Sequence, residues 1–143
     1  MAEAGFAVRL IGRVDRAARS LLRLPEVDHR GEVPHAKLPA ALSGVDAFVL
    51  PYRLNSLTRA ISPAKTYEGL ATGRPVVASP LPSLAALGDL VYLAESPEEF
   101  VRTLRSLPAL ETEDRIRKRI SAARQNSWEA RFAEIEEELW RRM

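Results

Sequence analysis

The chain of 143 residues contains no cysteine and only two histidines. Without cysteine, disulfide bonds and thiolate metal sites are excluded. His29 and His35 have no cluster of further metal ligands beside them, so we expect structural or surface roles for both and no bound metal. No apolar run approaches the length of a membrane span. The apolar run within the first sixteen residues is too short for a signal peptide and is interrupted by charged residues. We therefore expect a cytoplasmic protein.

The chain also lacks a large excess of charge of either sign. Its formal net charge is +2, although 28% of its residues are charged. A charge so nearly balanced does not favour nucleic acid as a partner, which would need a local basic patch. With 46% hydrophobic residues, the composition is that of an ordinary soluble domain, and the length suffices for one domain with a real core.

Short apolar runs alternate with helical patterns along the first 110 residues. The predicted strands are 5–12, 27–31, 46–52, 74–79 and 90–95, and the predicted helices between and after them are 14–25, 35–44, 62–73, 82–88 and 96–107. The polar stretch 53–61 reads as a loop. Alternation with short connections predicts a three-layer α/β domain with a parallel sheet of five or six strands and helices on both faces.

The last 33 residues are helical and rich in charge. Two helices, 112–125 and 127–143, are predicted with a break near Asn126, and we therefore divide the chain into a core, 1–110, and C-terminal helices, 111–143. Trp128, Phe132, Ile135 and Leu139 form one apolar stripe, which suits packing on the core or against another domain. Positions 115, 117, 118 and 119 are all basic, so this helix could contact an anionic membrane, but nearby acidic residues favour an ordinary charged helix face.

Two Ser-Pro pairs open two of the predicted helices and differ in one respect. Ser62 and Ser96 are both expected to be N-caps with proline at the first helical position. Glu99 completes a capping box in the second helix. The first helix has Lys65 there instead, where a positive charge faces the positive end of the helix dipole at a cost of roughly 0.3–1 kcal/mol. A bound anion would offset this cost.

Lys65 and Glu68 lie on one face of the same helix. Since ligands of open parallel sheets bind beyond the carboxyl ends of the strands, this helix start should face a site. Lys65 and the backbone amides would take a phosphate, and Glu68 would accept hydrogen bonds from a sugar diol. The alternative is a solvated ion pair between residues three apart. Spacing alone leaves both interpretations open.

Three segments together resemble a known family. The segment "ISPAKTYEGLATGRPVVAS" (61–79) resembles the "SPxKxxEYxAxGxPVVA" core of the glycosyltransferase group 1 enzymes, which have the GT-B architecture of two Rossmann-like domains. The segments 27–55 and 126–139 are similar to the stretch that precedes this core and to the family's last helix. The resemblance covers almost the whole chain. It implies the C-terminal, nucleotide-sugar-binding half of a retaining, metal-independent glycosyltransferase, acting on cell-envelope or exopolysaccharide glycans without a cofactor.

The resemblance also implies roles for matched positions. Glu68 would hold the donor ribose, and Lys65 would act catalytically by stabilising the leaving diphosphate. The other matched donor-binding residues are Ser62 and Ala64 near the phosphates, Gly12 at the end of the first strand, and Gly31, Glu32 and Val33 at the nucleobase. Ala60 stands where the fuller signature has a glutamate. Arg13 is a poor substitute for the family's basic residue after the first strand, so the diphosphate contact should depend more on Lys65 and Arg59.

The implied partners are a nucleotide-sugar donor and an N-terminal acceptor-binding half that this chain lacks. We therefore expect an inactive fragment that binds donor, could dimerise through the surface left by the absent half, and could contact the inner face of the membrane as part of the full protein. Two other classes stay open. One is half of a nucleotide-sugar epimerase of the same architecture, although few further histidines and carboxylates are present. The other is a non-catalytic module that has lost the site, which Ala60 favours.

Overall fold

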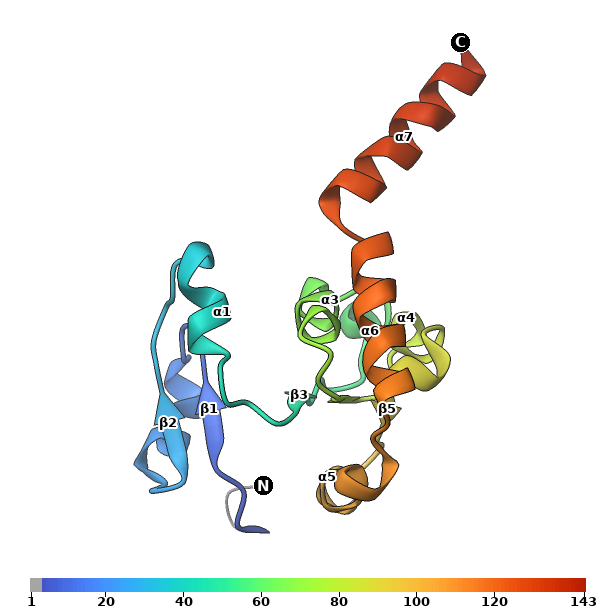
Figure 1. Cartoon of the computed structure of the whole chain (residues 1–143). Helices are drawn as coiled ribbons and strands as arrows, with labels where there is room; N and C mark the ends of the chain where they lie inside the picture. Colours follow the sequence, from blue (N-terminus) through green and yellow to red (C-terminus); the bar gives the residue numbers. More distant parts are fainter. Residues whose placement is uncertain (1–3) are drawn as a thin grey trace. The chain divides into compact units, whose positions relative to one another are not determined.

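A computed structural model describes residues 4–143, which fall into two compact units, 4–45 and 46–143 (Figure 1). The first unit contains the strands β1 (Val8–Leu10) and β2 (Val27–His29), the 3-10 helices η2 (Arg16–Arg23) and η3 (His35–Lys37), and α1 (Leu38–Ala41). The strands pair in parallel, with Leu10 opposite His29. The connection between them is helical, as parallel pairing requires, but it has 3-10 geometry.

The second unit is built on the parallel three-stranded sheet β3-β4-β5. The sheet consists of β3 (Phe48–Leu50), β4 (Val76–Ala78) and β5 (Tyr92–Leu93), and the helices are α2 (Ser56–Arg59), α3 (Ala64–Ala71), α4 (Pro82–Ala85), η4 (Gly88–Leu90), α5 (Pro97–Leu110), α6 (Glu113–Gln125) and α7 (Trp128–Arg142). All three residues of the central strand β4 are buried. A strand covered on both faces is the arrangement that parallel sheets require.

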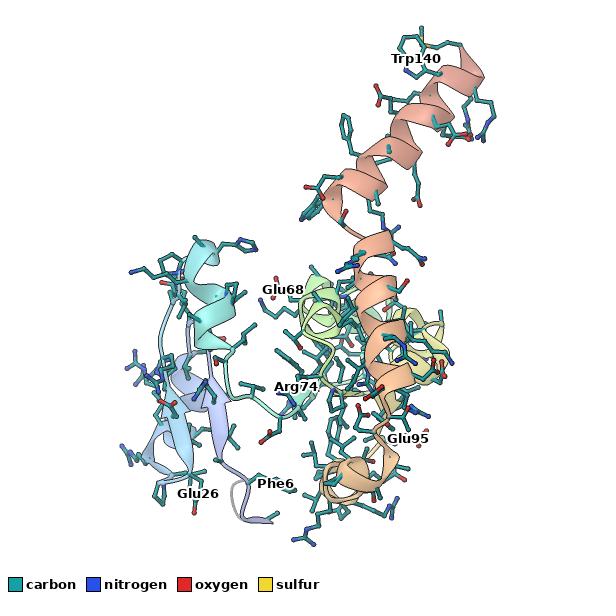
Figure 2. The ribbon with its side chains drawn as sticks, viewed as in Figure 1. Phe6, Glu26, Glu68, Arg74, Glu95 and Trp140 are labelled. Atoms are coloured by element: carbon teal, nitrogen blue, oxygen red, sulfur yellow. The ribbon has the colours of Figure 1, made fainter. Side chains whose placement is uncertain are left out.

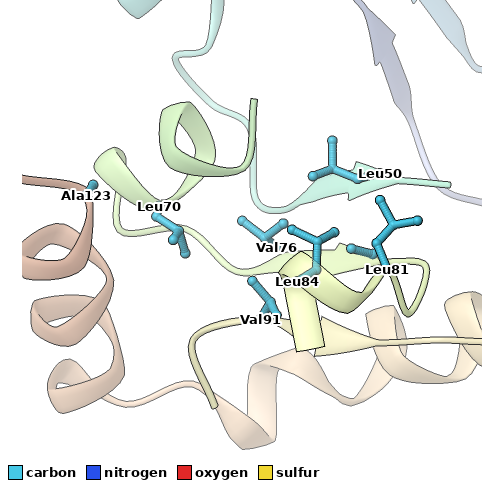
Figure 3. Close-up of a cluster of buried hydrophobic side chains, with 8 residues drawn as sticks. Leu50, Leu70, Val76, Leu81, Leu84, Val91 and Ala123 are labelled. Atoms are coloured by element: carbon cyan, nitrogen blue, oxygen red, sulfur yellow. The ribbon is translucent and has the colours of Figure 1, made fainter. Parts of the chain in front are cut away.

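The core of the second unit gathers side chains from strands and helices that are distant in sequence (Figure 3). Leu70, Val76, Leu81 and Leu84 are at most 1% exposed. Each such side chain stabilises the fold by roughly 1.5–3 kcal/mol relative to an exposed one. Ala123 joins the same cluster from α6, so this C-terminal helix packs on the core.

The predicted parallel α/β class is confirmed, with some differences in detail. Each of the five strands lies inside its predicted range, and they are distributed over a two-stranded and a three-stranded sheet. The predicted loop 53–61 contains a helical turn, α2, because Asn55 and Thr58 form a reciprocal capping box. Helix α5 extends to Leu110, beyond its predicted end, with Pro108 inside its last turn.

The two Ser-Pro helix starts differ in their caps. Ser96 accepts a hydrogen bond from the Glu99 amide, so the predicted N-cap is confirmed. The predicted capping box is wrong in one contact, because the Glu99 carboxylate accepts from the Glu95 amide, one residue before the N-cap, and not from the Ser96 amide. The prediction that Ser62 caps α3 is wrong. Pro63 is buried and occupies the N-cap position in an extended conformation, so Ser62 lies one residue too early for its side chain to reach the first turn.

The basic cluster of α6 is not one exposed face. Arg119 is fully buried and forms a bidentate ion pair with Glu111, and its guanidinium also donates to the carbonyls of Gly73 and Leu90. The exposed Arg117 and Lys118 pair with acidic residues one turn earlier. The prediction of a continuous charged face is therefore wrong at Arg119, because the side chain anchors α6 to the fold.

Helix α7 has an apolar stripe that nothing in residues 4–143 covers. Trp128 is 84% exposed and Phe132 68% exposed, and none of the residues of this helix is buried. No helix of residues 4–143 is long and apolar enough to cross a membrane.

Candidate functional site

Two glycine turns meet at the carboxyl ends of β1 and β2. Gly12 has a φ of 115° and Gly31 a φ of 64°, a region that side-chain-bearing residues rarely adopt. The Gly12 amide donates to the Gly31 carbonyl over 2.7 Å. An added Cβ at either glycine would meet no atom within 4 Å, so both turns border open space. A ligand could therefore approach the backbone closely at this edge.

The side chains beside these turns are charged or polar. Arg13 pairs with Glu32 over 3.5 Å, and both side chains are exposed. Val33 follows and is half-buried. The parallel pairing of β1 and β2 thus brings the predicted residues of the first unit to one edge.

Sequence reasoning missed one residue at this edge. The imidazole Nε2 of His29 lies 2.9 Å from the Gly12 carbonyl oxygen. His29 ends β2, and its place at the end of a parallel strand was the signal that could have singled it out.

Next to His29, Asp28 forms a small ion-pair network. A hydrogen bond from Arg30 and the charges of Arg30 and Arg9 lower the pKa of the Asp28 carboxyl below its ordinary value. Arg9 also donates to the carbonyl of Ala41, the last residue of α1, and to that of Ser43 just after it. This network therefore fastens the strands of the first unit to α1 and keeps Asp28 ionised.

The predicted residues of the second unit lie in α2, in α3 and in the loop between them. Ser62, Ala64 and Lys65 are exposed. Glu68, labelled in Figure 2, lies one turn further along α3 and is half-buried. Within residues 4–143 no hydrogen bond engages the amides of Ala64 and Lys65. Amides of this kind, the positive end of the helix dipole and a cation such as the Lys65 ammonium are the groups that attract an anion to a helix N-terminus.

The alternative interpretation of Lys65 and Glu68 was an ion pair. Among the ion pairs of residues 4–143, Lys65 and Glu68 do not appear. Arg59 ends α2 and is exposed, and Ala60 follows it without a carboxylate. Lys65, Arg59 and Glu68 are therefore accessible to a ligand.

A second group of perturbed ionisable residues surrounds Arg119. Burial alone would raise the pKa of Glu111, but hydrogen bonds from Arg119 and Tyr92 and the charges of Arg119 and Arg115 outweigh burial, and the pKa lies below its ordinary value. Burial and the neighbouring Glu111 raise the pKa of Tyr92 above its ordinary value, so its hydroxyl continues to donate. The hydrogen bonds of Arg119 and Tyr92 to Glu111, and of Arg119 to the Gly73 and Leu90 carbonyls, tie α6 to the rest of the second unit.

No group of three or more residues able to hold a metal ion exists within residues 4–143. The groups considered are those of histidine, cysteine, aspartate and glutamate side chains.

Comparison with known proteins identifies the class. A family profile described as glycosyl transferase-like matches residues 1–137, and the chain belongs to this family. A putative teichuronic acid biosynthesis glycosyltransferase of Bacillus subtilis (strain 168), TuaH, is 28% identical over 126 residues. The match covers 85% of this chain and 32% of the relative, so the chain spans about a third of that protein's length.

Proposed function

We propose that this chain is the donor-binding half of a retaining, metal-independent glycosyltransferase that uses a nucleotide-diphosphate sugar to build a cell-envelope or exopolysaccharide glycan. The observation that carries the proposal is the first turn of α3. Within residues 4–143 its Ala64 and Lys65 amides make no hydrogen bond, the Lys65 side chain is exposed, and Glu68 lies one turn away. The matching family and the teichuronic acid in the name of the Bacillus subtilis relative support this choice of reaction.

Lys65 and the start of α3 would act on the leaving group. As the bond between the anomeric carbon and the diphosphate oxygen breaks, the diphosphate departs with the electron pair. The acceptor hydroxyl oxygen bonds to the same carbon, and its proton passes to an oxygen of the departing diphosphate. A cation and oriented amides stabilise the charge that builds on the diphosphate in the transition state.

The remaining residues would bind other parts of the donor. Glu68 accepts hydrogen bonds from the ribose hydroxyls, and the backbone of Gly31, Glu32 and Val33 receives the base. Gly12 allows close approach of the donor. Ser62 and Arg59 supply further phosphate contacts, whereas Arg13 contributes less because it pairs with Glu32.

The chain on its own would bind donor without transferring the sugar. It spans only 32% of the relative, and the acceptor-binding half would lie in the rest of a longer protein. The exposed apolar stripe of α7 supports docking on that half, or pairing of two copies when the half is absent. In the longer protein this half would work in the cytoplasm, at or near the inner face of the membrane.

Calorimetric titration with UDP, GDP and ADP tests the proposal. We expect binding of one nucleotide, and we expect Lys65→Ala and Glu68→Ala each to raise its Kd about tenfold, since each removes a charge-assisted contact worth about 1.4 kcal/mol. The same samples, given nucleotide sugar and acceptor, should transfer no sugar.

The matched controls are Lys118→Ala and Glu113→Ala, which remove an exposed lysine and an exposed glutamate from α6. Both should bind like the unsubstituted chain. A folded chain that binds none of the three nucleotides would contradict the proposed function, as would equal binding by all variants.

A further inference from the structure

The Gly12 turn is held from both sides by hydrogen bonds. Its amide donates to the carbonyl of Gly31, and its carbonyl lies 2.9 Å from Nε2 of His29. Because a carbonyl oxygen only accepts, the hydrogen of this bond belongs to Nε2 of the imidazole. We call Gly12, His29 and Gly31 the glycine clasp.

The glycine clasp lies where the regular pairing of β1 and β2 ends. The last strand contact before it is the Arg30 amide donating to Leu10. Beyond this point both glycines have a positive φ, in the left-handed region. In a free chain, glycine populates many other backbone conformations as well. The bonds of the clasp therefore select one conformation for two turns that border open space.

We propose that His29 is a positioning residue of the donor site, whose Nε2–H holds the Gly12 turn in the shape that receives the nucleotide. The inference rests on the proposed function. A turn already held in the bound conformation loses less entropy when the ligand binds, so its preorganisation raises affinity without any contact between His29 and the donor.

The clasp needs a hydrogen on Nε2 and does not need a charge on the imidazole. The neutral Nε2–H form and the imidazolium both donate to the Gly12 carbonyl. A neutral amide placed at the same point should therefore replace the imidazole, which distinguishes a hydrogen-bonding role from a role of histidine charge or ring size.

Substitution at His29 tests the inference in the whole chain, again with UDP, GDP and ADP as probes. His29→Phe keeps a ring and removes the hydrogen-bonding Nε2–H group. We expect it to raise the Kd of the bound nucleotide about fivefold, which corresponds to the free energy of one ordinary hydrogen bond. His29→Gln, whose amide nitrogen can reach the position of Nε2, should stay within about twofold of the unsubstituted chain. His35→Ala, at the other histidine of the same unit, is the control and should have no effect.

Hydrogen exchange of the unliganded chain adds a readout that does not depend on nucleotide. The Gly12 amide should exchange faster in His29→Phe and at the original rate in His29→Gln. Should the phenylalanine variant fail to fold, His29→Asn removes the donor by shortening the side chain, and the same losses are expected.

The outcomes separate the two proposals. If the unsubstituted chain binds no nucleotide, the proposed function is overturned, and with it the role of His29 in positioning the nucleotide site. Nucleotide binding that His29→Phe leaves unchanged overturns the role of His29 alone. Equal losses in the phenylalanine and glutamine variants also overturn it, because the donated hydrogen would not be what matters.

Discussion

Thr66 has a hydroxyl that is fully buried and, within residues 4–143, finds no hydrogen-bond partner. It lies in the first turn of α3, directly after Lys65. Thr72, at the other end of the same helix, uses its hydroxyl twice, donating to the Gly69 carbonyl and accepting from the Arg74 amide. The buried hydroxyl of Thr66 is therefore unsatisfied, whereas the hydroxyl of Thr72, an exposed residue, makes two hydrogen bonds.

Replacing each threonine by valine should have opposite effects on stability. Thr66→Val removes an unsatisfied hydroxyl and should raise the free energy of unfolding by about 1 kcal/mol, whereas Thr72→Val removes two hydrogen bonds and should lower it by about 1 kcal/mol. Urea denaturation of both variants measures the difference. A loss of stability in Thr66→Val would show that its hydroxyl has a partner.

The sequence alone was sufficient to single out the candidate anion-binding residues, but not the histidine that contacts the Gly12 turn. Lys65 and Glu68 were predicted because they are close in sequence. His29 was assigned a structural or surface role, since its partner Gly12 is seventeen positions away and only the parallel pairing of β1 and β2 brings them together.

At the scale of the element, the two Ser-Pro helix starts show how local rules succeed and fail. Helix α5 follows the rule, with Ser96 as its cap. Helix α3 begins one residue later than the rule predicts, because Pro63 is buried at the N-cap position, and its first turn is left without a side-chain cap. The uncapped start belongs to the helix that we propose binds the diphosphate.

Alanine substitutions should therefore separate the two serines. Ser96→Ala should lower the free energy of unfolding by about 1 kcal/mol, because it removes the bond to the Glu99 amide. Ser62→Ala, at an exposed side chain without a capping bond, should change it by less than about 0.5 kcal/mol. Thermal and urea unfolding measure both, and a loss in Ser62→Ala equal to that in Ser96→Ala would restore Ser62 as a cap.

At the scale of the whole molecule, Arg119 joins parts of the second unit that are far apart in sequence. Its side chain is fully buried, and its partners are Glu111 before α6 and the carbonyls of Gly73 and Leu90. Tyr92 donates to the same carboxylate, and the guanidinium of Arg115 lies 5.3 Å from its ring centre. Glu111 is thus the one carboxylate of this group, and the buried guanidinium depends on it.

Glu111→Gln should destabilise the second unit by about 3 kcal/mol at pH 7, since breaking a buried ion pair leaves a charge without its partner. The pKa of Glu111 is lowered from 4.5, so its contribution is complete above that pH and is lost as the pH falls through the lower folded value. The unsubstituted chain should therefore lose more stability between pH 6 and pH 3 than Glu111→Gln does.

Chemical unfolding at a series of pH values measures this difference. Glu113→Gln is the matched control, because its carboxylate is 92% exposed in a surface ion pair, and its acid sensitivity should equal that of the unsubstituted chain. Identical acid sensitivity in Glu111→Gln would contradict the proposed importance of the buried pair.

The local pattern of the sequence determined the parallel α/β class, the places of the five strands, the cap of α5 and the likeness to a glycosyltransferase family. These features follow from apolar runs, from glycine and proline at the ends of elements, and from capping residues, all of which act over a few positions. Short sequence motifs can likewise be recognised without the tertiary structure. The glycines at positions 12 and 31 were likewise evident, because each closes a predicted strand.

Tertiary structure alone decided which charged residue would be buried and which turns would be joined. Arg119 looks like its neighbours Arg117 and Lys118 in sequence, and only packing of α6 against the core aims it at Glu111 and two distant carbonyls. The division of the strands into two sheets, the late start of α3 and the glycine clasp are of the same kind. Each depends on contacts between residues far apart along the chain, whose free energy no local propensity contains.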